Sequence, residues 1–139
     1  MHSKQRSRPM RMKLMILVLS VLFPATALAM AFGGDDAADK NKMVMEANEK
    51  AMAGEYAAAI DMLQQAVADD PENAEAWNIL GYSYRNIGEM DAAWDAYERA
   101  LAIDPNHQGA HEYLGEWYLA QGDVASAQAQ LAKLAAIAR

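Results

Sequence analysis

Apolar and small residues recur at helical spacing along most of the chain, in blocks separated by glycine and proline. Between residues 74 and 107 they form two such blocks, which Gly88 divides and Pro105 closes. Apolar positions three and four residues apart mark one face of a helix, and glycine and proline mark the turns between helices. The segment is therefore predicted to be a helical hairpin, with helices over about 74–87 and 90–103.

The same marks recur 34 residues away on both sides of this hairpin. The repeated positions are Gly54, Gly88 and Gly122, then Ala59, Ala93 and Ala127, and finally Pro71 and Pro105. Self-similarity at a fixed period of this size is typical of stacked helical repeats. We therefore predict an all-α fold, an α-solenoid of three hairpins and six helices, within a domain over residues 40–139. Its repeats are predicted at 40–73, 74–107 and 108–139.

A different pattern precedes the repeats. Residues 1–13 are basic without an acidic residue, residues 14–23 form an apolar run, and the small residues Ala27-Leu28-Ala29 follow. This order is typical of a secretory signal peptide. We predict a signal peptide over residues 1–29, cleaved after Ala29, with cleavage after Ala31 as the alternative. Residues 30–39 mix glycine, alanine and aspartate without an apolar period, and are predicted to be a flexible leader.

The apolar stretch 14–32 is also about long enough to span a bilayer, so an uncleaved inner-membrane anchor is the alternative to a signal peptide. Pro24 and the small residues after it favour cleavage. In either case the basic flank stays in the cytoplasm and the repeats are expected outside it, in the periplasm. The sequence contains no cysteine. Disulfides, thiol catalysis and lipoprotein maturation are thereby excluded.

Removal of the predicted signal peptide changes the charge of the protein. Residues 1–29 hold five of the 12 basic residues and none of the acidic ones, which leaves seven basic against 19 acidic residues and a net charge of −12. Such a chain repels phosphate backbones and anionic headgroups, so we expect no nucleic-acid binding and no membrane insertion after cleavage. A basic or neutral protein partner suits it better. Acidity that only keeps an exported protein soluble is the alternative.

The middle repeat carries a specific set of large and small residues. They are Trp77, Leu80, Gly81, Tyr84, Gly88, Ala93, Tyr97, Ala100 and Pro105. This pattern resembles the tetratricopeptide repeat at every position. The third repeat departs from it at His111 and Leu134, and the first has Met43, Glu46 and Lys50 in place of the large residues of its first helix. The resemblance implies a binding scaffold rather than an enzyme.

In this family the first helices of the hairpins line a concave groove that holds peptides or partner helices. Carried onto this chain, the resemblance implies a partner-binding groove formed by Asn48, Glu75, Asn78, Tyr82, Arg85, Asn86, Glu112, Tyr113 and Glu116. The family's carboxylate clamp is absent: Asn48 fits one clamp position, but the others are occupied by Val44, Ile79, Gly109 and Tyr113. The glutamates favour a basic or hydrogen-bonding ligand.

Two histidines and the last helix offer alternatives. His107 and His111 are four residues apart and could face one metal ion, although capping and core packing are the favoured interpretation. The chain shows no nucleophile–base set or phosphate loop, and we expect no enzyme activity and no cofactor or resident metal. A metal or small-ligand carrier that uses the two histidines is the alternative.

The predicted last helix, 124–138, is alanine-rich and has apolar residues at Val124, Leu131, Leu134 and Ile137. Its own hairpin partner cannot cover all of them. This predicts partner docking or a homo-oligomer through this helix, and hence a second class of function, a self-assembling structural module. The alternative is that this helix is simply exposed to solvent, because an exposed alanine costs little free energy.

Overall fold

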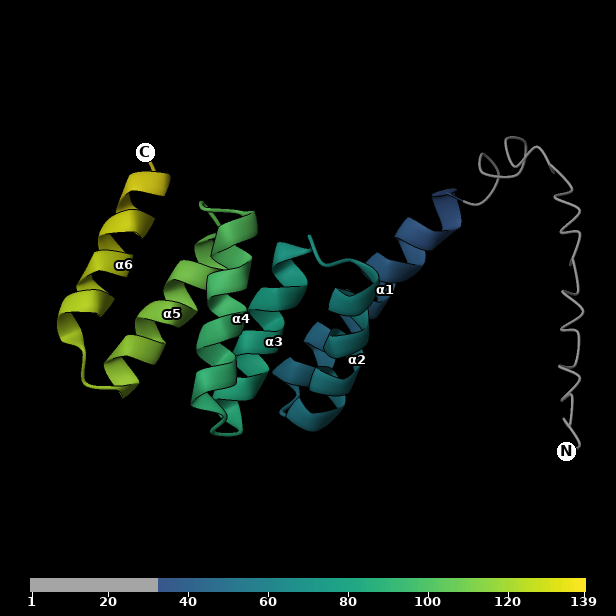
Figure 1. Cartoon of the computed structure of the whole chain (residues 1–139), viewed down its shortest axis with the longest axis horizontal. Helices are drawn as coiled ribbons and strands as arrows, with labels where there is room; N and C mark the ends of the chain where they lie inside the picture. The colour runs from purple at the N-terminus through teal and green to yellow at the C-terminus, as the bar shows by residue number, and fades with distance from the viewer. Residues whose placement is uncertain (1–32) are drawn as a thin grey trace, which may run out of the picture.

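The computed structural model describes residues 33–139, so the predicted signal peptide and its cleavage sites lie outside the described residues. The six helices are α1 (Gly33–Met52), α2 (Tyr56–Asp69), α3 (Ala74–Asn86), α4 (Met90–Ile103), α5 (Gln108–Ala120) and α6 (Val124–Ile137). They follow one another along the molecule as three hairpins (Figure 1). The predicted all-α class and hairpin arrangement are confirmed for this part of the chain. None of the helices described is long and apolar enough to cross a bilayer.

Successive hairpins pack mainly through the second helix of one and the first helix of the next, α2 on α3 and α4 on α5. The backbones of the first helices also approach one another, α1 with α3 and α3 with α5, whereas the backbones of α2 and α4, and those of α4 and α6, lie farther apart. The first helices of successive hairpins are therefore closer together than the second helices. The array curves toward α1, α3 and α5, which form its inner side.

Glycine ends the first helix of each hairpin. Gly54, Gly88 and Gly122 have φ angles of 80°, 86° and 78°. This left-handed conformation is common for glycine and rare for other residues, and it stops a helix. A Cβ at any of the three would meet no described atom within 4 Å. The 34-residue glycine period thus reflects backbone conformation rather than lack of space.

Alanines lie where helices cross, and they allow the axes to approach closely. Six alanines have no exposed surface in the described structure: Ala47, Ala59, Ala76, Ala93, Ala100 and Ala110. Larger side chains fill the spaces between these crossings. Leu63 packs between α1, α2 and α3, while Tyr97 and Leu114 form a second cluster between α4 and α5.

Helix α1 begins earlier than the sequence predicts. Residues 33–39, assigned to a flexible leader, belong to α1, which starts at Gly33 rather than at Lys40. Ala37 and Ala38 are strong helix formers, and a carboxylate such as Asp39 is favourable in the first half of a helix because of the helix dipole. The absence of an apolar period was therefore not a sign of irregular structure.

Candidate functional site

Four of the predicted groove residues meet on the inner side of the array. The ring centroids of Tyr82 on α3 and Tyr113 on α5 lie 5.0 Å apart. The Arg85 guanidinium lies 5.9 Å from each of these two centroids. Its Nη2 also forms an ion pair with Glu116 Oε2. We call Tyr82, Arg85, Tyr113 and Glu116 the α3–α5 cluster; cation–π and charge attraction hold it together.

A third tyrosine extends the cluster into the first repeat. The Tyr56 ring, at the first residue of α2, lies 6.1 Å from that of Tyr82 in an edge-on arrangement. Tyr56, Tyr82 and Tyr113 are each partly exposed, so every repeat presents one ring on this side. Beneath them Tyr97 is fully buried, 6.3 Å from Tyr113. The sequence prediction omitted Tyr56, although its place directly after a hairpin turn puts it beside the next first helix.

Carboxylates make the potential around these rings negative. The pKa of Tyr113 is raised, first by burial and then by the negative charges of Glu112, Glu116 and Glu75, while Arg85 acts in the opposite direction. Burial is also the main cause of the raised pKa of Tyr82. Glu112 is exposed, and the Glu116 side chain keeps 46% of its surface exposed. Three predicted groove glutamates therefore converge on one tyrosine.

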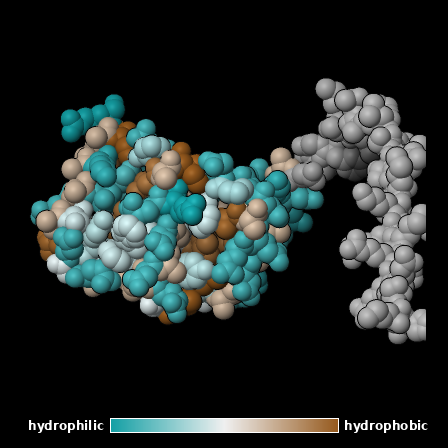
Figure 2. All heavy atoms as spheres, in the orientation of Figure 1, coloured by the Kyte–Doolittle hydropathy of each residue, from teal (hydrophilic) through white to brown (hydrophobic). Residues whose placement is uncertain are grey.

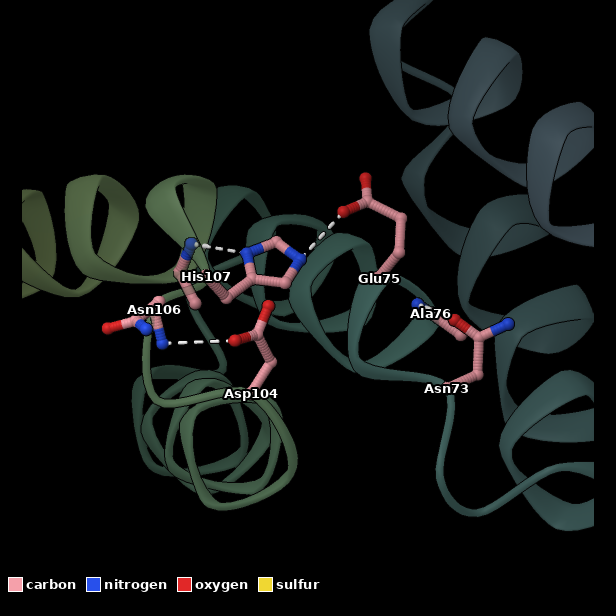
Figure 3. Close-up of polar contacts among 7 residues, drawn as sticks. Asn73, Glu75, Ala76, Asp104, Asn106 and His107 are labelled. Carbon is pink, nitrogen blue, oxygen red and sulfur yellow. Dashed lines mark hydrogen bonds and ion pairs between the residues drawn. The ribbon is translucent and has the colours of Figure 1, made fainter. Parts of the chain in front are cut away.

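Glu75 accepts a hydrogen bond from His107, for which the sequence predicted a helix-capping role. His107 Nδ1 accepts a hydrogen bond of 3.1 Å from the backbone N–H of Ala110, which caps α5. Its Nε2 therefore carries the proton, and donates it to Glu75 Oε2 at 2.9 Å (Figure 3). Asn73 caps α3 in the same way through Ala76 at 3.0 Å. The predicted capping role of His107 is confirmed, and His107 additionally ties the start of α5 to α3.

The three predicted groove asparagines do not join the α3–α5 cluster. Asn78 is only 4% exposed, and its Oδ1 has no hydrogen-bond partner among the described residues. Its Nδ2 lies 2.9 Å from where a Cβ on Gly109 would stand. Asn86 is exposed, but its Nδ2 donates to the Tyr82 carbonyl one turn earlier, at 2.8 Å. Asn48 is half-buried on α1.

The two histidines do not present a shared metal site. His111 is 3% exposed, with Nδ1 2.8 Å from Gln130 Oε1 and Nε2 2.8 Å from the Pro105 carbonyl. Both ring nitrogens of His107 are also engaged. Within residues 33–139, no group of three or more histidine, aspartate or glutamate side chains could hold a metal ion. His111 fills the core position of the repeat's first aromatic residue, as the favoured interpretation expected.

The three stacked helical hairpins place this protein in the class of helical-repeat scaffolds, and its inner side is aromatic and acidic. Family models described as tetratricopeptide repeat match residues 44–108 and 88–139. The chain belongs to the tetratricopeptide repeat family. No curated protein matches it.

Several solved structures share this fold. The type III secretion translocator chaperone SycD of Yersinia enterocolitica, in an alternative dimer, is 20% identical with a TM-score of 0.66, and the match covers 70% of this chain and 74% of SycD. MamA is 31% identical with a TM-score of 0.64, over 70% of this chain and 57% of MamA. This chain therefore spans little more than half of MamA.

A third similar structure contains a peptide. The second tetratricopeptide domain of Spaghetti (RPAP3), bound to the HSP90 peptide SRMEEVD, is 17% identical with a TM-score of 0.68. The match covers 74% of this chain and 95% of that one. At this identity the likeness shows the fold alone.

Proposed function

We propose that this protein is a non-enzymatic scaffold that binds an extended, basic segment of another protein on the inner side of its array. The observation that carries the proposal is the row of Tyr56, Tyr82 and Tyr113, one ring per repeat, with carboxylates around it. Tyrosine faces give a large contact area at little entropic cost, and they attract arginine and lysine side chains. The glutamates add charge-assisted hydrogen bonds to the same ligand groups.

The charges of the groove disfavour an acidic ligand. Arg85 already has a carboxylate partner in Glu116, and Glu75 and Glu112 lie beside the rings. The HSP90 peptide bound by RPAP3 has the acidic sequence EEVD at its end. A similar peptide would meet the like charges of these glutamates. The residues that would clamp its terminal carboxylate are also replaced in this chain. The ligand of this chain is therefore basic or neutral.

We place this activity in the cell envelope. The signal-like order of residues 1–29 supports export to the periplasm and cleavage after Ala29, with a retained inner-membrane anchor as the alternative. Mass spectrometry of the protein isolated from the producing cell tests this proposal. A chain that begins at Met30 supports cleavage after Ala29, a chain that begins at Phe32 supports the alternative site, and an intact chain supports the anchor.

Affinity capture from the envelope fraction tests the binding site. The wild type, Tyr82→Ala and Glu98→Gln are compared as baits; Glu98 is an exposed carboxylate on α4, away from the inner side. Partners that bind the groove are recovered with the wild type and Glu98→Gln and lost with Tyr82→Ala, whose helical circular dichroism must match the wild type. Recovery of the same partners by all three baits would place the binding site elsewhere.

The second class of function, self-assembly through the last helix, would use a different face of the molecule. Leu119, Val124 and Leu131 are all more than half exposed there. This face does not include the tyrosine row but shares Glu112 and Glu116 with the inner groove, so mutations at Tyr82 and at Leu131 separate the two activities.

A further inference from the structure

The Arg85 guanidinium occupies a site formed by three side chains on the inner side of the array. Its Cζ lies 5.9 Å from the ring centroid of Tyr82 on α3 and 5.9 Å from that of Tyr113 on α5. Its Nη2 pairs with the Glu116 carboxylate. A guanidinium is a flat, weakly hydrated cation that stacks on aromatic rings and pairs with carboxylates. Two rings and a carboxylate therefore make a site that suits this group in particular.

The walls of this site are more exposed to solvent than its occupant is. The Glu116 side chain keeps 46% of its surface exposed, and the Arg85 side chain keeps 21%. Tyr82 and Tyr113 are both partly exposed. A second arginine side chain that arrives from solvent can therefore contact the groups that hold Arg85, and would compete with Arg85 for them.

Arg85 is itself incompletely satisfied in this site. Its Nε is buried and has no hydrogen-bond partner among the described residues. Burial raises the pKa of the neighbouring Tyr97 and the Arg85 charge opposes this rise, yet the Tyr97 hydroxyl also lacks a partner in this part of the chain. A buried N–H without an acceptor costs free energy. An arginine of a ligand would enter from the open side with its Nε in water, so an exchange of the two side chains relieves this cost.

We propose that Tyr82, Tyr113 and Glu116 form a subsite for an arginine side chain of the partner, and that Arg85 fills this subsite until the partner displaces it. This subsite rests on the proposed function, because it lies in the same groove. Arg85 competes with the ligand, so it lowers the affinity for the partner rather than raising it. The subsite selects arginine over lysine, because an ammonium group is strongly hydrated and has no flat face to stack on the rings.

Arg99 on α4 offers a matched comparison. Its Cζ lies 5.5 Å from the Trp77 ring centroid, so it is also an arginine stacked on an aromatic residue. It is exposed and lies away from the inner side of the array. Arg85→Gln and Arg99→Gln therefore remove the same charge, one inside the subsite and one outside it.

The test must separate the subsite from general attraction between opposite charges. Figure 2 shows hydrophilic residues over much of the face that it draws, and the chain has a net charge of −7, so the protein attracts a basic peptide without a specific site. Two capped peptides of equal charge are therefore compared, Gly-Arg-Gly-Arg-Gly-Arg-Gly and Gly-Lys-Gly-Lys-Gly-Lys-Gly. Their affinities are measured by NMR titration of protein purified from cells that express the full-length chain.

We expect the wild type to bind the arginine peptide more tightly than the lysine peptide. Arg85→Gln should bind the arginine peptide about tenfold more tightly than Arg99→Gln does, because its subsite is open in every molecule. The gain should be smaller for the lysine peptide, whereas relief of charge repulsion alone would raise both affinities equally. Tyr82→Ala in the same chain should abolish the gain.

Arg85→Lys gives a second measurement that does not depend on a change of charge. It keeps the cation and most of the aliphatic stem, which protects the fold, but it loses the flat group that fills the subsite. It should bind the arginine peptide more tightly than the wild type, while Arg99→Lys should not. Helical circular dichroism shows whether each variant is folded.

The outcomes separate this subsite from the proposed function. Arginine-peptide binding that Tyr82→Ala abolishes, but that neither Arg85→Gln nor Arg85→Lys strengthens, would overturn the subsite and leave the proposed function intact. A wild type and an Arg85→Gln variant that bind neither peptide would overturn both.

Discussion

Gly81 on α3 faces the ring of Tyr97 on α4 with no room for a side chain between them. A Cβ at Gly81 would lie 2.6 Å from Tyr97 Cε1 and 2.7 Å from Cδ1. Tyr97 cannot move away easily, because it is fully buried between α4 and α5. We expect Gly81→Ala to lower the free energy of unfolding by about 1–3 kcal/mol, the usual cost of overpacking a core. Urea unfolding followed by circular dichroism measures this.

Gly115 is the matched control, since it occupies the same place in the third repeat. A Cβ there would lie 3.5 Å from Gln130 Cβ, an ordinary contact. Alanine favours a helix over glycine by about 1 kcal/mol. Gly115→Ala should therefore be neutral or stabilising. If Gly115→Ala destabilises as much as Gly81→Ala, packing on Tyr97 is not the cause.

The buried phenol of Tyr97 should make the folded protein less stable at high pH. Burial raises its pKa well above the ordinary value of 10.0. In the unfolded chain the phenol ionises near that value while the folded chain keeps its proton, so its contribution to stability is full below pH 10 and falls as the pH rises further. The hydroxyl has no hydrogen-bond partner among the described residues, so Tyr97→Phe should change stability little at neutral pH. Urea midpoints between pH 8 and about 11 should fall less steeply for Tyr97→Phe than for the wild type; parallel curves would contradict this account.

The cap of α5 predicts a difference between two substitutions of His107. His107→Ala removes the acceptor for the Ala110 N–H, and should cost about 1 kcal/mol of stability. His107→Asn should restore most of this loss, because Asn73 makes the same cap at the equivalent position of α3. Thermal unfolding of the three proteins measures the difference. Equal melting temperatures for the alanine and asparagine variants would show that the cap contributes nothing.

The capping carboxylate of Asp123 should account for part of the loss of stability at acid pH. Hydrogen bonds from the Ser126 hydroxyl and backbone N–H lower the pKa of Asp123 below its ordinary value of 3.8. A lowered folded-state pKa means that the contribution to stability is full above the ordinary value and is lost as the pH falls through the folded-state value. Asp123→Asn keeps a capping oxygen without this titration. Its melting temperature should therefore fall less than that of the wild type between pH 5 and about 2, and an unchanged fall would contradict the assignment.

Much of the fold could be predicted from the sequence, because its determinants are local. The left-handed glycines and the caps at Asn73 and His107 act within a few residues, and the 34-residue period repeats them. The predicted start of α1 was wrong because no helix-breaking residue separates residues 33–39 from the helix that follows.

The groove was harder to predict, because its contacts join different repeats. The family pattern gives the side of the array on which Tyr82 and Tyr113 lie. It does not give the Arg85–Glu116 pair or the His107–Glu75 bond, which depend on the distance between α3 and α5. It also does not show that Asn78 is buried against Gly109.

Hydrogen–deuterium exchange of the protein, alone and bound to a captured partner, tests the central claim most directly. If a basic segment lies along the tyrosine row, partner binding should slow exchange in α3 and α5, including the peptides that contain Tyr82 and Tyr113. Exchange in α4, on the outer side, should stay unchanged. Protection confined to α4 or α6, with α3 and α5 unaffected, would contradict binding on the inner side of the array.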